Sequence, residues 1–135
     1  MEHLYQTATK FAPQLLFLAF IIITFLQSGI DKLTDWKGNV SFLKEHFSKT
    51  FLKNTVPLLL GIITFSELVA GVLAILGIIQ IYISGSTIIG FYAAVIAAKV
   101  LLALLFGQRV AKDYVGAMTI AVYFMITVFG VSILN

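Results

Sequence analysis

Residues 56–83, VPLLLGIITFSELVAGVLAILGIIQIYI, form an apolar run long enough to cross a membrane, and Glu67 is its one charged side chain. A charged group at bilayer depth costs about 2.5–3.5 kcal/mol even on permissive insertion scales, so it must face protein, water or an opposite charge. The next apolar run, GFYAAVIAAKVLLALLF at 90–106, contains Lys99. We therefore predict that Glu67 and Lys99 meet inside a helical membrane bundle.

The composition indicates an integral membrane protein whose main environment is the lipid bilayer. Of its 135 residues, 60% are hydrophobic and 11% are charged, whereas about a quarter of the residues in soluble domains are charged. The net charge of +3 comes from basic residues beside the apolar runs, where they orient membrane proteins, so we expect no nucleic-acid binding. Cysteine is absent, and His3 and His46 lie outside the apolar runs. The chain therefore lacks the residues for an Fe–S cluster or an intramembrane haem, and we expect no metal site and no resident electron carrier.

Four apolar runs predict an all-α fold, an integral membrane four-helix bundle that forms a single domain over 1–135. The expected helices are 11–30, 56–83, 86–106 and 114–134. A signal peptide is the alternative for the first run, but the run lacks a small-residue cleavage site and three more spans follow it. Small residues recur along the second and third runs and predict close helix packing or a homodimer interface. They are Ser66, Ala70, Ala74, Gly77, Gly90, Ala94, Ala97 and Ala98.

The segment between the first two runs predicts an amphipathic helix at about 39–53. Its apolar residues recur every three or four positions, and lysines and serines fall on the other side. The apolar set is Trp36, Val40, Leu43, Phe47 and Phe51, and the polar set is Lys37, Ser41, Lys44 and Ser48. Such a helix either lies in the membrane interface or folds over the mouth of the bundle as a lid.

Depth along the helices places Glu67 and Lys99 at a similar level. At 1.5 Å per residue, Glu67 lies roughly 16 Å below Val56, and Lys99 lies roughly 12 Å below Gly107. One half of the bundle is expected to hold nearly all polar groups, which gives a polar cavity with Glu67 and Lys99 as catalytic candidates. The alternative is an ion pair that only fixes helix register. The ligand-binding candidates are Gln27, Asp31, Lys32, Tyr92, Arg109, Asp113 and Tyr114.

The distribution of cations predicts the orientation in the membrane. The two loops that share one side carry seven basic residues, whereas Lys10 and the terminal amine lie on the other side. The positive-inside rule therefore predicts cytoplasmic loops and external termini. As the membrane itself, we expect a bacterial inner membrane. The seven are Lys32, Lys37, Lys44, Lys49, Lys53, Arg109 and Lys112.

Three groups of residues resemble the DoxX family, and the resemblance covers nearly the whole chain. They are Gly29-Ile30-Asp31-Lys32-Leu33, then Pro57 with Glu67-Leu68-Val69-Ala70-Gly71 and Gly77, and finally Gly107-Gln108-Arg109 with Asp113-Tyr114-Val115-Gly116-Ala117. The resemblance implies a four-helix membrane bundle linked to oxidoreductase systems. The family is named for a subunit of thiosulfate:quinone oxidoreductase, and some members are membrane anchors in redox-defence assemblies. The positions that match its pattern are Gly29, Lys32, Glu67, Gly71, Arg109 and Asp113.

Three function classes are compatible with these residues. The first is a redox-associated subunit that binds a quinone or another small apolar ligand and needs a separate redox protein partner. In it, Lys99 or Arg109 polarises a quinone carbonyl and Glu67 relays a proton. The second is a non-catalytic membrane anchor or assembly factor. The third is a small proton-coupled exporter, which the absence of a mid-span acid in the first helix disfavours.

Overall fold

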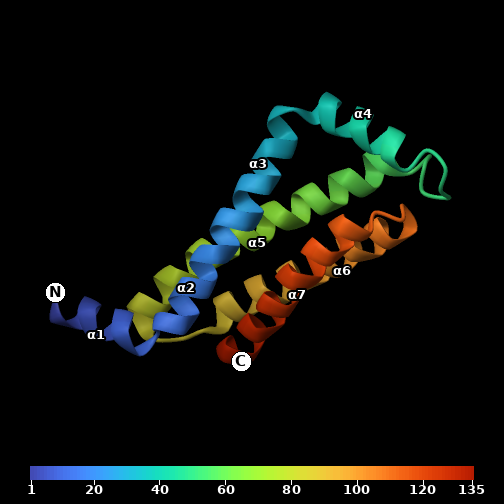
Figure 1. Cartoon of the computed structure of the whole chain (residues 1–135). Coiled ribbons are helices and arrows are strands. Elements are labelled where there is room, and N and C mark those ends of the chain that lie inside the picture. The colour runs from blue at the N-terminus through green and yellow to red at the C-terminus, as the bar shows by residue number, and fades with distance from the viewer.

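The computed structural model describes residues 1–135 and contains helices and turns but no strands. Helices α2, η1 and α3 join into one span, Ala12–Thr34. This span and helices α5, α6 and α7 are the four helices that are long and apolar enough to cross a membrane. Figure 1 shows these spans side by side, with α4 at one end. The predicted all-α four-helix membrane bundle is confirmed. The elements are α1 (Glu2–Lys10), α2 (Ala12–Ile21), the π-helix η1 (Ile22–Leu26), α3 (Gln27–Thr34), α4 (Trp36–His46), α5 (Val56–Ser84), α6 (Ile88–Val110) and α7 (Tyr114–Leu134).

The ends of the spans differ from the predicted bounds by a few residues. The first span continues from Ile30 to Thr34, and the third ends at Val110. Gly85 ends α5 in the left-handed conformation, with φ of 73°, and its N–H donates to the carbonyl of Ile81. Asp113 begins α7, because its carboxylate accepts the N–H of Gly116 at 2.9 Å.

The helices of the bundle pack in a row, with the first span laid across it. Helix α5 packs on α6, and α6 packs on α7. The α2 part of the first span contacts all three of these helices, whereas α3 packs on α5 and has no substantial contact with α6 or α7. In Figure 1, α3 accordingly runs away from α7 toward the end where α4 lies. The first span therefore meets three helices at its α2 end and α5 alone, among the other spans, at its α3 end.

Close approach of the helices depends on small residues, as the sequence predicts. A Cβ atom added to Gly77 would lie 2.8 Å from the Cα atom of Gly90, so α5 and α6 cross almost backbone to backbone. A Cβ atom on Gly71 would lie 3.0 Å from the Cα atom of Leu26 in η1. Most of the predicted small residues are buried, while Ser66 and Ala98 are half-buried. The packing faces of α5 and α6 were thus predicted correctly.

Helix α4 is shorter than the predicted 39–53 and ends at His46. Residues 47–55 form turns, in which the Thr50 hydroxyl donates to the Phe47 carbonyl and accepts the N–H of Leu52. These side-chain hydrogen bonds compete with the helical ladder, which explains the early end. The amphipathic pattern itself is confirmed within α4, where Val40 is half-buried and Lys37 is exposed. Helix α4 packs on α5 and α3, its neighbours along the chain, and this position at one end of the bundle fits both the interfacial helix and the lid.

The opposite end of the bundle also contains polar contacts, which corrects the expectation that one half holds nearly all of them. The Gln14 side chain donates to the Ile133 carbonyl at 3.2 Å, and the Thr87 hydroxyl donates to the Leu134 carbonyl at 2.8 Å. The N–H of Ile89 donates to the side chain of Gln80 at 2.9 Å. The first two contacts tie α7 to α2 and to the start of α6, and the third ties α6 to α5, all at the Lys-poor end of the bundle.

Candidate functional site

Glu67 forms an ion pair with Lys32. Its Oε1 atom lies 2.8 Å from Lys32 Nζ, and the exposed fractions of the two side chains are 3% for Glu67 and 19% for Lys32. Lys32 Nζ also donates to the Ser28 hydroxyl at 2.6 Å. No hydrogen bond of regular geometry reaches Glu67 Oε1, so charge attraction dominates the contact. A buried carboxylate is thus neutralised by a neighbouring helix within the membrane-spanning region.

Two glycines bring the first span close enough to α5 for this contact. Gly29 faces Leu68, since a Cβ atom on Gly29 would lie 2.7 Å from a methyl carbon of that leucine. Gly71 faces the backbone of Leu26 one helical turn beyond Glu67. The π-helical turn η1 (Ile22–Leu26) lies directly before the α3 residues that hold the pair. Such π-helical turns often occur at functional sites, and the sequence pattern gave no indication of this one.

The predicted pairing of Glu67 with Lys99 is wrong. Lys99 is exposed and forms no ion pair with any carboxylate. The depth of a residue along a helix does not determine in which direction its side chain points around the helix axis. Glu67 and Lys99 lie at similar depths, but their side chains point in different directions. The buried face of α6 includes Ala93, Ala97 and Val100, and Lys99 projects from another side. Glu67, in contrast, lies on the buried face of α5.

The other candidates on the first span and on α6 do not join this pair. Gln27 and Asp31 are exposed, and neither side chain has a hydrogen-bonding partner within the protein. Tyr92 is 57% exposed and packs edge-on against Phe91 near the start of α6, at the end of that helix opposite to Arg109. The inclusion of Tyr92 in a shared pocket was therefore wrong, because Tyr92 lies two residues after Gly90, which meets α5 at Gly77, ten residues along α5 from Glu67.

Arg109, Asp113 and Tyr114 form a separate cluster around the α6–α7 turn. The Arg109 guanidinium lies 5.3 Å from the ring centroid of Tyr114, a distance typical of a cation–π contact. His46, at the end of α4, lies 3.1 Å from the side-chain oxygen of Gln108 and 3.8 Å from Asp113 Oδ2. His46 thus links α4 to the α6–α7 turn. Sequence reasoning missed it because it considered histidine only as an intramembrane ligand.

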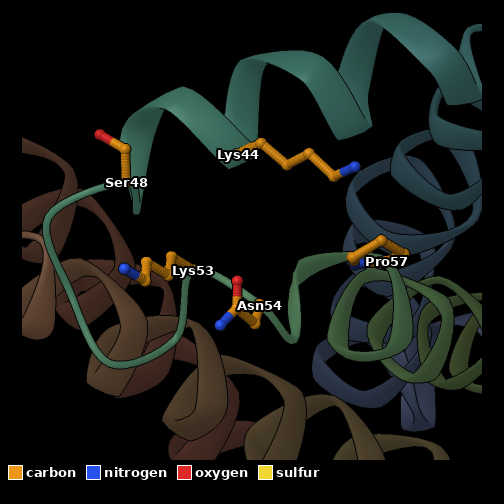
Figure 2. Close-up of a pocket in the computed structure, with 5 residues that line it drawn as sticks. All are labelled: Lys44, Ser48, Lys53, Asn54 and Pro57. Carbon is orange, nitrogen blue, oxygen red and sulfur yellow. The ribbon is translucent and has the colours of Figure 1, made fainter.

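A polar cavity of about 360 Å³ lies between α4 and the start of α5. Figure 2 shows Lys44 and Lys53 at its edge, with their ammonium groups directed away from each other. Neither lysine pairs with a carboxylate. The two positive charges at the cavity therefore do not converge on one point. At the Lys32–Glu67 pair, in contrast, a cation and a carboxylate are in contact. Its lining residues are Lys44, Ser48, Lys53, Asn54 and Pro57.

The fold and the Lys32–Glu67 pair define the class of this protein as a four-helix membrane bundle with a buried intramembrane ion pair. Comparison with protein-family models, with curated proteins and with solved structures finds no match to the chain. No group of three or more histidine, cysteine or acidic side chains is arranged to hold a metal ion. The candidate site consists of Ser28, Lys32 and Glu67, of which Ser28 and Lys32 are partly exposed and Glu67 is buried.

Proposed function

We propose that this chain is a DoxX-like membrane subunit or accessory of an oxidoreductase system, which binds a quinone or a similar apolar carbonyl compound at the Lys32–Glu67 pair. The observation that carries the proposal is the buried Glu67 carboxylate held 2.8 Å from a partly exposed Lys32 ammonium group. Both residues match positions that the family resemblance singles out. An intramembrane ionisable pair is a functional-site hypothesis by default, because its burial is costly.

The chemistry of Lys32 suits a ligand that has carbonyl oxygens. An ammonium group has three N–H donors; Ser28 accepts one, and Glu67 balances the charge. A donor therefore remains on the exposed side of Lys32 for a quinone carbonyl. Glu67 is too buried to touch such a ligand, so it acts as a positioning residue through Lys32. Electrons must come from a separate redox protein, since the chain carries no cysteine and its histidines lie outside the spans.

Trp36 provides a direct test of quinone binding, because it is the one tryptophan of the chain. Its ring lies against α5 at Gly61, which precedes Glu67 by roughly 9 Å along the helix. The protein in phosphatidylcholine nanodiscs is titrated with a short-chain ubiquinone analogue while tryptophan fluorescence is recorded. We expect saturable quenching, and we expect Lys32→Met to weaken the apparent affinity by about tenfold through loss of a charged hydrogen bond.

Lys99→Met is the matched control, because it removes a lysine from the membrane region away from the proposed site. This variant should keep the affinity of the unaltered protein. Quenching that does not saturate, or that is equal in the Lys32→Met and unaltered proteins, would contradict quinone binding here. Circular dichroism of each variant separates loss of binding from loss of fold.

The second candidate function is a non-catalytic anchor, and full charge compensation of Glu67 by Lys32 favours it. In that case the pair only holds the first span against α5. Purification from native membranes separates the two functions: a flavoprotein or cytochrome partner with quinone turnover that depends on Lys32 supports the redox role. A stable partner complex whose turnover is unaffected by Lys32→Met supports the anchor.

A further inference from the structure

Lys99 lies at the centre of a membrane span and is unpaired. It follows Ile88 by eleven residues and precedes Val110 by eleven, so both ends of α6 are roughly 16 Å away. Its side chain is exposed on the outer surface of the bundle. No carboxylate lies within ion-pair distance. The chain thus presents an uncompensated cation at the level of the lipid tails.

Snorkelling does not remove this cost. A lysine ammonium group rises along its four-carbon stem toward the headgroups only when it starts near a helix end. The stem spans about 6 Å, which is less than half of the roughly 15 Å half-thickness of the hydrocarbon core. A charged residue at this depth normally faces the bundle interior, a water-filled cavity or an opposite charge. None of these is provided within the chain.

Lys99 lines a groove between α5 and α6. Its volume is about 390 Å³, and Lys99 and Ser66 are its two residues that are not hydrophobic. Phe65 and Ile62, which also line it, are 70% and 53% exposed. The groove therefore combines apolar walls, a hydroxyl group and a cation on a surface that faces lipid. A second transmembrane helix with a carboxylate at its midpoint is complementary to all three features.

A second copy of this chain does not supply that carboxylate. Glu67 is buried and already paired with Lys32, and Asp31 lies only three residues before the end of its helix. An anionic lipid headgroup remains at the membrane surface, far from the middle of α6. We propose that the Lys99 groove docks a transmembrane helix of another protein, one that carries an aspartate or glutamate near the bilayer midplane. This interface is distinct from the Lys32–Glu67 pair and does not depend on quinone binding.

The test uses designed leucine-alanine helices of about 20 residues that carry Asp, Leu or Lys at the centre. The native chain has no cysteine, so Asn135→Cys gives a single labelling site for energy transfer to labelled helices in phosphatidylcholine vesicles. We expect the Asp helix to bind about tenfold more tightly than the Leu helix, and the Lys helix to bind least. Lys99→Leu should abolish the preference for Asp, and Lys99→Arg should retain it.

Two controls separate charge pairing from groove shape and from misfolding. Ala103→Trp fills the groove and should weaken binding of the Asp and Leu helices alike, because Ala103 is one of its lining residues. Lys99→Leu should keep the Leu-helix affinity of the unaltered protein, which shows that the groove is intact. Equal binding of the Asp and Leu helices, or an Asp preference that survives Lys99→Leu, would overturn the proposal. Neither result would affect quinone binding at Lys32.

Discussion

Lys32 neutralises Glu67 from the last turns of the first span, at the point where α5 is the one other span on which α3 packs. Removing one partner of a buried ion pair typically costs about 3–5 kcal/mol, because the other charge remains buried without compensation. Lys32 is partly exposed, so its own desolvation is incomplete, and Glu67 carries the greater share of the burial penalty. Loss of Lys32 should therefore harm the bundle more than loss of Glu67.

Asp113 has a structural role that can be separated from any functional one. Its carboxylate accepts the Gly116 N–H at 2.9 Å and thereby caps α7. Asp113→Ala should lower the free energy of unfolding by about 1 kcal/mol, as for other lost N-caps. Asp113→Asn keeps a capping oxygen and should retain most of that stability. Unfolding in mixed micelles measures both variants, and equal losses in the two would argue against the cap.

The residues of the pair were predictable only in part. A carboxylate in an apolar run predicts an opposite charge nearby, and this holds for Glu67. The choice of partner required the direction of each side chain around its helix. The small-residue stripe of α6, with Ala94 and Ala97, already indicates which face of that helix is buried, and Lys99 lies off that face. The position of Lys99 around the helix axis would thus have excluded it as the partner of Glu67, whereas its depth in the membrane did not.

Helices α5 and α6 depend on the Gly77–Gly90 crossing for their contact. Gly77→Ala places a Cβ atom 2.8 Å from a backbone atom of Gly90, so the two helices must separate. We expect a loss of about 1–3 kcal/mol in the free energy of unfolding, as for other overpacked sites. Gly61→Ala is the matched control: the nearest atom to its added Cβ is a Trp36 ring carbon at 3.9 Å, and alanine favours helix. A control as unstable as Gly77→Ala would contradict the packing argument.

Helix α4 is held against the rest of the molecule by His46 at its C-terminal end. His46→Ala removes the contact with Gln108 and should cost about 0.5–1.5 kcal/mol of local stability. The amide hydrogens of α4 should exchange faster, by the factor that corresponds to this loss of local stability. Exchange within α5 should stay unchanged. Lys49→Ala, in the exposed loop after α4, is the control and should leave both rates unaltered. Unchanged α4 exchange in His46→Ala would mean that other contacts hold the helix.

At the level of elements, periodicity predicted the helices well and their junctions less well. Apolar length was sufficient to identify four spans, and Gly85 and Asp113 mark real helix ends. The end of α4 coincides with the side-chain hydrogen bonds of Thr50, and the π-helical turn lies where the first span packs on α5 at Gly71. Such features arise from side-chain hydrogen bonds that compete with the backbone hydrogen bonds of the helix, and from packing between helices. A hydropathy pattern encodes neither of these.

The whole molecule has both termini at one end of the bundle, and α4 and the α6–α7 turn at the other, as Figure 1 shows. The cation count predicts that the α4 end faces the cytoplasm. Because the chain has no cysteine, Lys49→Cys and Asn135→Cys provide single labelling sites at opposite ends. In intact cells, an impermeant thiol reagent should label Asn135→Cys and spare Lys49→Cys until the membrane is opened. The reverse pattern would invert the predicted orientation.

The structure places Lys32, and not Lys99, against Glu67, so we expect Glu67 to be energetically coupled to Lys32 and independent of Lys99. The most direct measurement is a pair of double-mutant cycles on the free energy of unfolding in mixed micelles. One cycle combines Lys32→Met with Glu67→Gln, and the other combines Lys99→Met with Glu67→Gln. We predict a coupling energy of about 1–3 kcal/mol for the first cycle and additivity within about 0.5 kcal/mol for the second. Coupling of Glu67 to Lys99, with none to Lys32, would contradict the account.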